Sequence, residues 1–375
     1  MPGLMRCGYV AAWLGMIGAG IQTCQAAPGA VIAENLHAPP GFQITHYASG
    51  IPGVRMLHFT ASGALIASVP GRGRVILLSP GAMGAAPEIH VLLDGLNGPH
   101  GIDLHEGLLY VAEEDAVGRI AFNEKTGMVE GGYQRLITGL PEGGGHSTRT
   151  VRVGPDEKLY VTVGSSCNVC IEVDPRRAAM LRYDLDGRNG VIYAEGLRNP
   201  VGFDWRPSDG TLFATDNGRD LLGDDLPPCE LNLIEEGGHY GWPYAYGDNV
   251  PDPRYGPGAP EIIARAKPPV FEFRAHNAPL GIIFVRNSGA PPPLRGAALV
   301  ALHGSWNRSS KDGYKVVMLN WRADGKIEEQ DFVWGFLDNG KVSGRPVDIA
   351  EGPDGAFYIS DDYAGKIYRV AEIAH

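Results

Sequence analysis

The chain has 375 residues, of which 44% are hydrophobic and 20% charged, and it contains 53 Gly and 29 Pro. This is the composition of a globular protein rich in turns, and the length allows either two domains or one large all-β domain. The formal net charge is −11 and no basic run occurs, which argues against nucleic acid as a partner, because nucleic-acid binding needs a basic face.

The first residues have the features of a secretory signal peptide. Arg6 precedes a short apolar run at 9–21, and Cys24 and Ala26 stand at −3 and −1 of a cleavage site. A lipoprotein signal at Cys24 is the alternative, although the residues before it fit one poorly. The run is too short to span a membrane and no other long one occurs. We therefore expect residues 1–26 to be removed and the rest to be periplasmic or secreted, without a membrane span.

A short pattern recurs six times along the chain: a turn, an apolar β-rich triplet, then Gly or small polar residues. The triplet centres are Ile66, Tyr110, Tyr160, Phe213, Leu299 and Tyr358. Repeats of roughly 40–50 residues with several strands each are typical of β-propellers. We predict that residues 27–375 form one all-β, six-bladed β-propeller with a loop insertion at about 216–276 and no helical domain. The segment 42–47 is expected to pair with the last blade and close the ring.

A polar cluster stands shortly before most triplets, at the predicted start of the first strand of each blade. The clusters are Arg55-Met56, Pro99-His100-Gly101, His146-Ser147-Thr148-Arg149, Arg198-Asn199-Pro200, His276-Asn277-Ala278-Pro279 and Arg345-Pro346. In a propeller, such positions line the central channel, so clusters distant in sequence would meet on one axis. One cluster alone could simply tie neighbouring blades together, but several converging clusters favour a binding site.

An exported protein enters an oxidising compartment, in which its cysteines can pair. Cys167 and Cys170 frame the short loop Cys-Asn-Val-Cys, which in an exported protein is expected to be a local disulfide. A thioredoxin-like redox site is less favoured, because no βαβ pattern surrounds the motif. Ile171 follows Cys170 where covalent haem attachment needs His, so we expect no haem domain. Cys229 is expected to lie elsewhere.

The segment 196–243 is unusually rich in oxygen donors. These are Asp216, Asp220, Asp224, Asp225, Glu230 and Asn232. Ca²⁺ takes six to eight oxygen ligands from carboxylates, amides and backbone carbonyls, so the pattern suits a loop bound to this cation. A solvated acidic loop with turn-forming residues is the alternative.

The predicted axis gathers basic side chains in an otherwise acidic protein. They are Arg149, Arg198, Arg308 and Arg345, with Lys315 as a further candidate. Arg binds planar carboxylates through paired hydrogen bonds, so the expected ligand is a small anion with several carboxylates. His146 follows Gly143-Gly144-Gly145, a turn that lets the backbone approach closely, and a His titrating near ambient pH is a suitable general base.

The chain resembles the pyrroloquinoline quinone (PQQ) dependent sugar dehydrogenases, specifically the L-sorbosone dehydrogenase branch, which is related to soluble glucose and aldose sugar dehydrogenases. From residue 97 to the C-terminus, the motifs that carry the resemblance are GGGHSTRTVRVGPD, GSSCNVC, EGLRNPVGFDW, NGRDLLGDDLPPCELN, YGWP, HGSWNR and GRPVDIAEGPDGAFYISDD. The resemblance implies a six-bladed propeller that binds PQQ and Ca²⁺ on its axis. The three carboxylates of PQQ agree with the excess of Arg.

The resemblance also implies residue roles. His146 matches the general base, Arg198 and Asn199 the pair at the quinone, and residues 217–219 the segment whose carbonyls hold Ca²⁺. The predicted cofactor contacts are Arg149, Arg198, Asn199, Asn217, His276, Arg308 and Arg345. The predicted metal ligands are Gly218, Arg219, Asp224, Asp225 and Glu230. The glucose-oxidising members have Asp where this chain has Gly145, and Gln in the blade that here carries Pro99-His100, which concerns the substrate more than the cofactor.

The implied reaction is oxidation of an aldose or sugar aldehyde to a lactone or acid. His146 would take the hydroxyl proton, the hydride would move to the quinone, and Arg198 would stabilise the oxyanion. Electrons would pass to an external acceptor such as a cytochrome or the quinone pool. Two alternatives remain. A Ca²⁺-dependent lactonase would need carboxylates around the axis, and a non-catalytic propeller that binds glycans or proteins would need neither His146 nor a basic axis.

Overall fold

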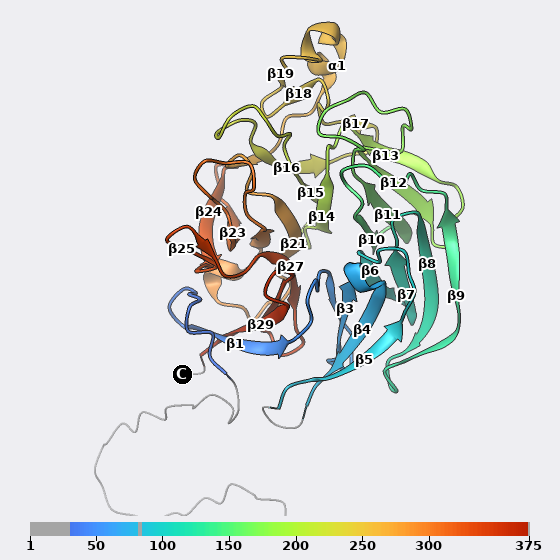
Figure 1. Ribbon diagram of the computed structural model, residues 1–375, viewed down its shortest axis with the longest axis vertical. Coiled ribbons are helices and arrows are strands. Elements are labelled where there is room, and N and C mark those ends of the chain that lie inside the picture. The colour runs from blue at the N-terminus through green and yellow to red at the C-terminus, as the bar shows by residue number, and fades with distance from the viewer. Residues whose placement is uncertain (1–30, 82–84, 374–375) are drawn as a thin grey trace, which may run out of the picture.

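The computed structural model describes residues 31–81 and 85–373, which form six sheets arranged in a ring (Figure 1). The predicted signal peptide lies outside these residues. Blade one contains β2 (Leu57–Phe59), β3 (Leu65–Val69), β4 (Arg74–Ser79) and β5 (Glu88–Leu93). Blade two contains β6 (Ile102–His105), β7 (Leu108–Ala112), β8 (Ala116–Asn123) and β9 (Met128–Thr138). Blade three contains β10 (Arg149–Val153), β11 (Lys158–Val163), β12 (Ala179–Asp184) and β13 (Val191–Glu195).

The second half of the ring follows the same order. Blade four contains β14 (Pro200–Trp205), β15 (Leu212–Asp216), β16 (Cys229–Ile234) and β20 (Phe271–Phe273). Blade five contains β21 (Pro279–Phe284), β22 (Ala298–Leu302), β23 (Lys315–Trp321) and β24 (Ile327–Val333). Blade six contains β27 (Pro346–Glu351), β28 (Phe357–Asp361), β29 (Lys366–Glu372) and β1 (Phe42–Ser49). The predicted six-bladed β-propeller is therefore confirmed.

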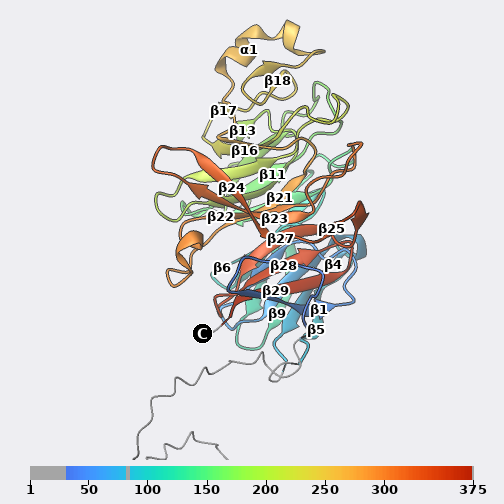
Figure 2. The same cartoon turned by 90° about the vertical axis from the view of Figure 1, so that its left-hand side faces the viewer.

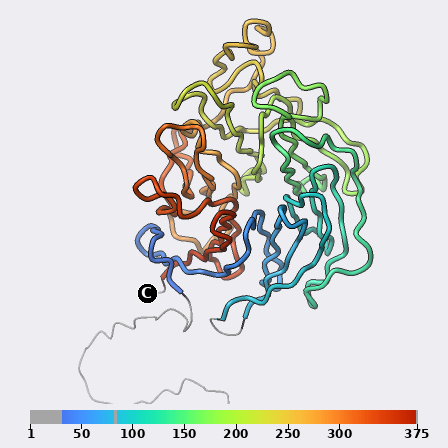
Figure 3. Tube along the Cα trace, viewed as in Figure 1, coloured from blue at the N-terminus to red at the C-terminus, as the bar shows by residue number. Residues whose placement is uncertain are grey.

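The first strands of the blades form the inner wall of the ring. In turn, β2, β6, β10, β14, β21 and β27 contact one another, and β27 contacts β2 again. The N-terminal strand β1 closes the ring by pairing antiparallel with β29, with Phe42 opposite Glu372 and Ser49 opposite Lys366. Figure 3 shows this blue segment running beside the red C-terminal strands. The expected pairing of residues 42–47 with the last blade is confirmed, and it joins the N-terminal segment to the C-terminal blade as the outermost strand of that blade.

The second strand of each blade is buried on both faces, which explains the wholly apolar triplets. In β11, Leu159 and Val161 pack in the cluster shared with blade two, whereas Tyr160 packs in the cluster shared with blade four. Side chains alternate across a strand, so each triplet supplies two neighbouring cores at once. The other triplet centres likewise face the next blade along the chain. Each large side chain buried in this way contributes about 1.5–3 kcal/mol.

The predicted insertion at 216–276 includes two strands of blade four itself, β16 and β20. Between them, β17 (Gly238–His239) adds a parallel strand to β13, and β18 (Ala245–Tyr246) pairs with β19 (Val250–Pro251). The part with β18, β19 and α1 (Pro260–Arg265) projects from the outer edge of the ring (Figures 1 and 2).

The remaining elements are short. They are η1 (Pro70–Arg72), η2 (Gly256–Gly258), η3 (Pro292–Leu294), β25 (Leu337–Asp338) and β26 (Lys341–Val342). Within the described ranges, the six-residue α1 is the one α-helix, and none of the helices there has the length and apolar character needed to cross a membrane.

Candidate functional site

The channel on the propeller axis has two different mouths, because all six inner strands run through the ring in the same direction. The residues that precede these strands meet at one end, which we call the strand-start mouth; it includes His146, Arg198 and Arg345. The residues at the strand ends meet at the strand-end mouth, which includes His58 and Glu351. Each mouth opens into a cavity.

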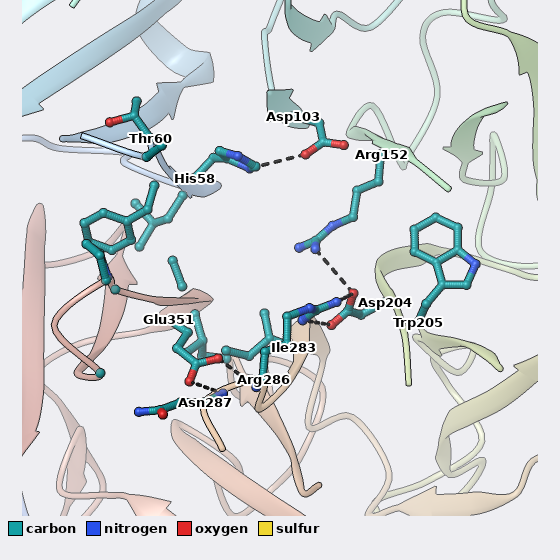
Figure 4. Close-up of a pocket in the computed structure, with 18 of the residues that line it drawn as sticks. His58, Thr60, Asp103, Arg152, Asp204, Trp205, Ile283, Arg286, Asn287 and Glu351 are labelled. Atoms are coloured by element: carbon teal, nitrogen blue, oxygen red, sulfur yellow. Dashed lines mark hydrogen bonds and ion pairs between the residues drawn. The ribbon is translucent and has the colours of Figure 1, made fainter. Parts of the chain in front are cut away.

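The strand-end mouth encloses about 710 Å³, and its charged groups hold blades together (Figure 4). The carboxylate of Asp103 accepts a 2.7 Å bond from the backbone N–H of Val153 in the next blade. The carboxylate of Asp204 likewise accepts a 2.7 Å bond from the backbone N–H of Phe284, and the guanidinium of Arg286 donates to Asp204 at 2.7 and 2.9 Å. These buried carboxylates are satisfied by the protein itself, so the charges here have a structural explanation.

The strand-start mouth encloses about 420 Å³, within the range of about 300–1,000 Å³ typical of small-molecule sites. Its polar lining residues are Arg55, His146, Asn168, Arg198, Asn199, Asn217, Asp220, Cys229, His276, His303, Trp306 and Arg345. Three arginines therefore face a single carboxylate on the cavity wall. Within residues 31–81 and 85–373, the buried side-chain oxygens of Asn199 and Asn217 have no hydrogen-bond partner, so both can accept from a ligand or coordinate a cation.

His146 has one ring nitrogen engaged and one free. Its Nδ1 lies 2.9 Å from the backbone oxygen of Ser165 and 2.9 Å from the Ser165 hydroxyl. A proton on Nδ1 satisfies the carbonyl and leaves the lone pair on Nε2, which is the tautomer a base needs. Burial, followed by the charge of Arg198, lowers the pKa of His146 to about 4. The imidazole is therefore neutral and able to accept a proton at neutral pH.

Two glycines allow His146 to sit where it does. Gly144 has a left-handed backbone with φ of 88°, and a Cβ there would lie 2.5 Å from the backbone oxygen of Ser166. Gly164, on the neighbouring loop, would place a Cβ 2.6 Å from the Cβ of His146 and 2.7 Å from Oδ1 of Asn199. The turn before His146 and the loop after β11 can pack this closely only without side chains at both positions.

Arg198 and Asn199 are held in place through their backbone. The carboxylate of Asp216 at the end of β15 accepts bonds from the N–H of Arg198 at 2.8 Å and of Asn199 at 2.6 Å. The Arg198 guanidinium then donates to the backbone oxygen of Asn217 at 3.1 Å and pairs with Asp220 at 3.1 Å. Burial raises the pKa of Asp216 to about 7 against the effect of these bonds.

Two of the predicted cofactor contacts do not lie on the cavity wall. Arg149 is fully buried, and its guanidinium donates to the backbone oxygens of Pro141, His146 and Thr148 at 2.5–2.9 Å. Arg308 donates to the backbone oxygen of Asp224, to that of Ala275 at 3.3 Å and to that of Ser310 at 3.1 Å. Both guanidinium groups thus hold loops around the site. By contrast, Arg198, Asn199, Asn217, His276 and Arg345 do line the cavity.

The predicted metal ligands fall into two groups: Gly218, Arg219 and Glu230 line one small cavity, whereas Asp224 and Asp225 do not. Gly218 also lies on the wall of the strand-start cavity, and the Arg219 side chain pairs with Asp252. Asp224 accepts from Ser309, and Asp225 is largely exposed and pairs with Arg308. Glu230 faces the small cavity together with Asp216, and burial raises the pKa of Glu230 to about 8. The acidic loop therefore ties blade four to blade five, and oxygen donors at the cavity come from Asn217, Gly218 and Asp220.

Several lining residues were not singled out as site residues from sequence. They are Asn168, His303 and Trp306, together with Asp220, which had been noted only as part of the acidic loop. All follow the second strand of a blade, and in an antiparallel sheet the second strand ends where the first begins. Polar residues directly after each apolar triplet would have indicated them. Trp306 is 72% exposed at the cavity rim.

The cysteines are placed as expected. Cys167 and Cys170 form a disulfide with a Cα–Cα distance of 6.2 Å. Cys229 is unpaired and buried on the cavity wall, where burial raises the pKa of its thiol. The only group of three or more His, Cys, Asp or Glu ligand atoms that gathers within the described ranges is Cys167, Cys170 and Glu172, and its sulfurs are already bonded to each other.

Comparison with known proteins agrees with this architecture. The TrAA12-like family model matches residues 36–229 and 262–372. An uncharacterized protein of Borreliella burgdorferi is 35% identical over 298 residues, which are 76% of this chain and 78% of that protein. A PQQ-dependent pyranose dehydrogenase of Coprinopsis cinerea is 24% identical over 94% of this chain but only 57% of its own length. The calcium structure of the Trichoderma reesei family AA12 enzyme has a TM-score of 0.77 at 21% identity, covering 94% of this chain and 99% of that one. The chain belongs to the TrAA12-like family.

Proposed function

We propose that this protein is a PQQ-dependent sugar dehydrogenase that oxidises an aldose or sugar aldehyde, of the glucose or sorbosone type, to a lactone or acid. The observation that carries the proposal is the pairing, on one cavity, of a neutral His146 with the guanidinium of Arg198. Related proteins named for this chemistry include the Coprinopsis cinerea pyranose dehydrogenase and the aldose sugar dehydrogenase of Escherichia coli.

The cavity suits an anion with several carboxylates. Arg198 pairs with Asp220 and Arg55 pairs with Asp362 at 2.8 Å, which leaves Arg345 as the excess positive charge on the wall. In this proposal the three arginines, with Asn199 and His276, hold PQQ. Ca²⁺ would take oxygen ligands from the segment 217–220, where the Asn217 side-chain oxygen lacks a partner. Bound PQQ supplies the hydride acceptor, and Ca²⁺ supplies Lewis-acid activation.

The side chains of this protein would handle the proton and the charge. Nε2 of His146 accepts the proton of the substrate hydroxyl, and the bond from Nδ1 to Ser165 keeps the ring oriented during transfer. Arg198 faces the oxygen on which negative charge develops. The exposed indole of Trp306 at the rim offers an apolar face on which a sugar ring can stack. Arg149 and Arg308 contribute by holding loops.

The two alternatives fit this cavity less well. A Ca²⁺-dependent lactonase would need several carboxylates around the axis, and the cavity wall carries Asp220 alone. A non-catalytic glycan-binding propeller explains Trp306 but neither the free Nε2 of His146 nor the excess of arginine. Export, with electrons delivered to an external acceptor, remains part of the proposal and agrees with the disulfide.

The test is reconstitution of the purified protein with PQQ and Ca²⁺, followed by dye-linked oxidation of a panel including glucose, other aldoses and L-sorbosone. We expect sugar-dependent dye reduction that needs both additions, and no lactone hydrolysis. Failure to oxidise any sugar would reject the dehydrogenase, and Ca²⁺-dependent hydrolysis of a lactone would replace it with the lactonase.

A further inference from the structure

The loop closed by the Cys167–Cys170 disulfide contacts both side chains to which the proposed function assigns catalysis. Just before the disulfide, Ser165 accepts the bond from Nδ1 of His146 and donates its hydroxyl to the backbone oxygen of Cys167 at 2.7 Å. Within the disulfide, Asn168 contacts Arg198. Residues 164–178 contain no helix or strand, so the disulfide restricts this stretch of backbone together with hydrogen bonds such as that from the Ser165 N–H to the Arg198 oxygen at 2.8 Å.

Asn168 holds Arg198 with two of its atoms. Its backbone oxygen accepts from Nε of Arg198 at 2.9 Å, and its side-chain oxygen accepts from Nη2 at 2.9 Å. The Asn168 side chain also bonds to the backbone of Asp220. Its oxygen accepts from the Asp220 N–H at 2.7 Å, and its amide nitrogen donates to the Asp220 backbone oxygen at 3.2 Å. The Asn168 amide therefore joins three separate loops at the cavity wall.

Hydrogen bonds within the protein use all but one of the donors of the Arg198 guanidinium. A guanidinium has five N–H groups. One on Nε goes to Asn168, two on Nη2 go to Asn168 and Asp220, and one on Nη1 goes to the backbone oxygen of Asn217. A single Nη1 hydrogen is left without a partner among the residues that the structure describes. Its direction is set by the plane of the guanidinium, and Asn168 provides two of the four bonds that fix that plane.

We propose that Asn168 is a positioning residue for Arg198, and that the Cys167–Cys170 disulfide fixes the loop that presents it. The catalytic meaning of this role rests on the proposed function, since it aims the one free donor of Arg198 at the ligand. The hydrogen bonds between Asn168 and Arg198 form without a cofactor, so they can be tested on the protein alone. Removing the Asn168 side chain deletes its bond to Nη2 of Arg198 and the two bonds that hold the backbone of Asp220, whose carboxylate makes a second bond to Nη2. The guanidinium can then rotate more easily about its remaining bonds, one of which is to the Asn168 backbone oxygen.

The first test needs no cofactor. Parent, Asn168→Ala and Cys167→Ser/Cys170→Ser proteins are treated with phenylglyoxal, and modification of Arg198 is measured by peptide mass mapping. The Arg198 side chain is 6% exposed, so the parent should react slowly there. We expect several-fold faster modification in both variants, with the matched variant Asn287→Ala, at the strand-end mouth, behaving like the parent (Figure 4). Unchanged reactivity of Arg198 in Asn168→Ala overturns the proposal, and unchanged reactivity in the Ser double variant alone overturns the part given to the disulfide.

The second test uses the protein reconstituted with PQQ and Ca²⁺. A misplacement of about 1 Å can cost on the order of 10²-fold in rate, so Asn168→Ala should lose up to that factor in kcat with a smaller change in KM. Asn168→Asp keeps an acceptor oxygen toward Arg198 and should recover part of kcat, whereas a merely structural role would give no such recovery at equal thermal stability. Parent-like kcat in Asn168→Ala overturns the positioning role. If the parent oxidises no sugar, the proposed function fails, and the labelling experiment still decides about Asn168.

Discussion

Substituting Gly164 by Ala is a small change that should disturb both sides of the proposed site. The added methyl would lie 2.6 Å from the Cβ of His146 and 2.7 Å from Oδ1 of Asn199. Restoring an ordinary carbon–carbon contact of 3.4 Å requires His146 to move by about 0.8 Å. A displacement of this size costs on the order of 10²-fold in turnover, or about 2.7 kcal/mol of transition-state stabilisation.

The assay is dye-linked sugar oxidation by Gly164→Ala after reconstitution with PQQ and Ca²⁺, with thermal unfolding measured in parallel. Overpacking should cost about 1–3 kcal/mol of folding free energy, which leaves the protein folded at 25 °C. Gly132→Ala is the matched control, because nothing lies within 4 Å of the added methyl and its backbone is not left-handed. Parent-like turnover in Gly164→Ala would show that the placement of His146 and Asn199 does not matter for the reaction.

Three further outcomes follow from the same contacts. His146→Ala should retain PQQ, seen by its absorbance, but lose about 10²–10⁴-fold in turnover, and parent-like turnover would exclude His146 as the base. The pKa of His146 falls from 6.5 to about 4 on folding, so the unfolded chain binds a proton at a higher pH than the folded protein does. The free energy of unfolding therefore decreases as the pH falls from 6.5 toward 4. Urea titrations should show that this decrease in the free energy of unfolding is smaller by up to about 3 kcal/mol in His146→Ala than in the parent. The same pH dependence in both proteins would contradict the lowered pKa of His146. Arg149→Gln should lower the free energy of unfolding by about 1–3 kcal/mol, because backbone oxygens lose a buried donor, and an unchanged urea midpoint would refute this role.

The six-bladed ring could be predicted from sequence because a buried, apolar second strand recurs in every blade. Each triplet is apolar throughout, since its centre faces one neighbouring blade and its flanks face the other, as Tyr160 does between blades three and four. The closing strand was also predictable, because residues 42–47 alternate like a strand and the ring needs a partner for its last edge. Clusters such as Arg198-Asn199 precede inner strands, and inner strands must begin at one mouth.

The contacts made by individual loops could not be predicted in this way. Arg149 and Arg198 both belong to clusters at the start of inner strands, but Arg149 is the first residue of β10 and is enclosed by backbone oxygens of its own turn, while Arg198 precedes β14 by two residues and reaches the cavity. Asp224 resembles a Ca²⁺ ligand in sequence, but in the fold it accepts from Ser309. These differences depend on loop conformations that have no period. The place of Asn168 after β11 could have marked it as a lining residue, but its contact with Arg198 could be seen only in the structure.

The measurement that tests the central claim most directly is a crystal structure of the protein grown with PQQ and Ca²⁺. We expect one PQQ in the cavity at the strand-start mouth, with its carboxylates near the arginines of the wall. We also expect a cation near residues 217–220 and Nε2 of His146 facing the space left for the substrate. The contradicting result is an empty strand-start cavity at saturating PQQ, or PQQ bound at the strand-end mouth between Asp103 and Arg152.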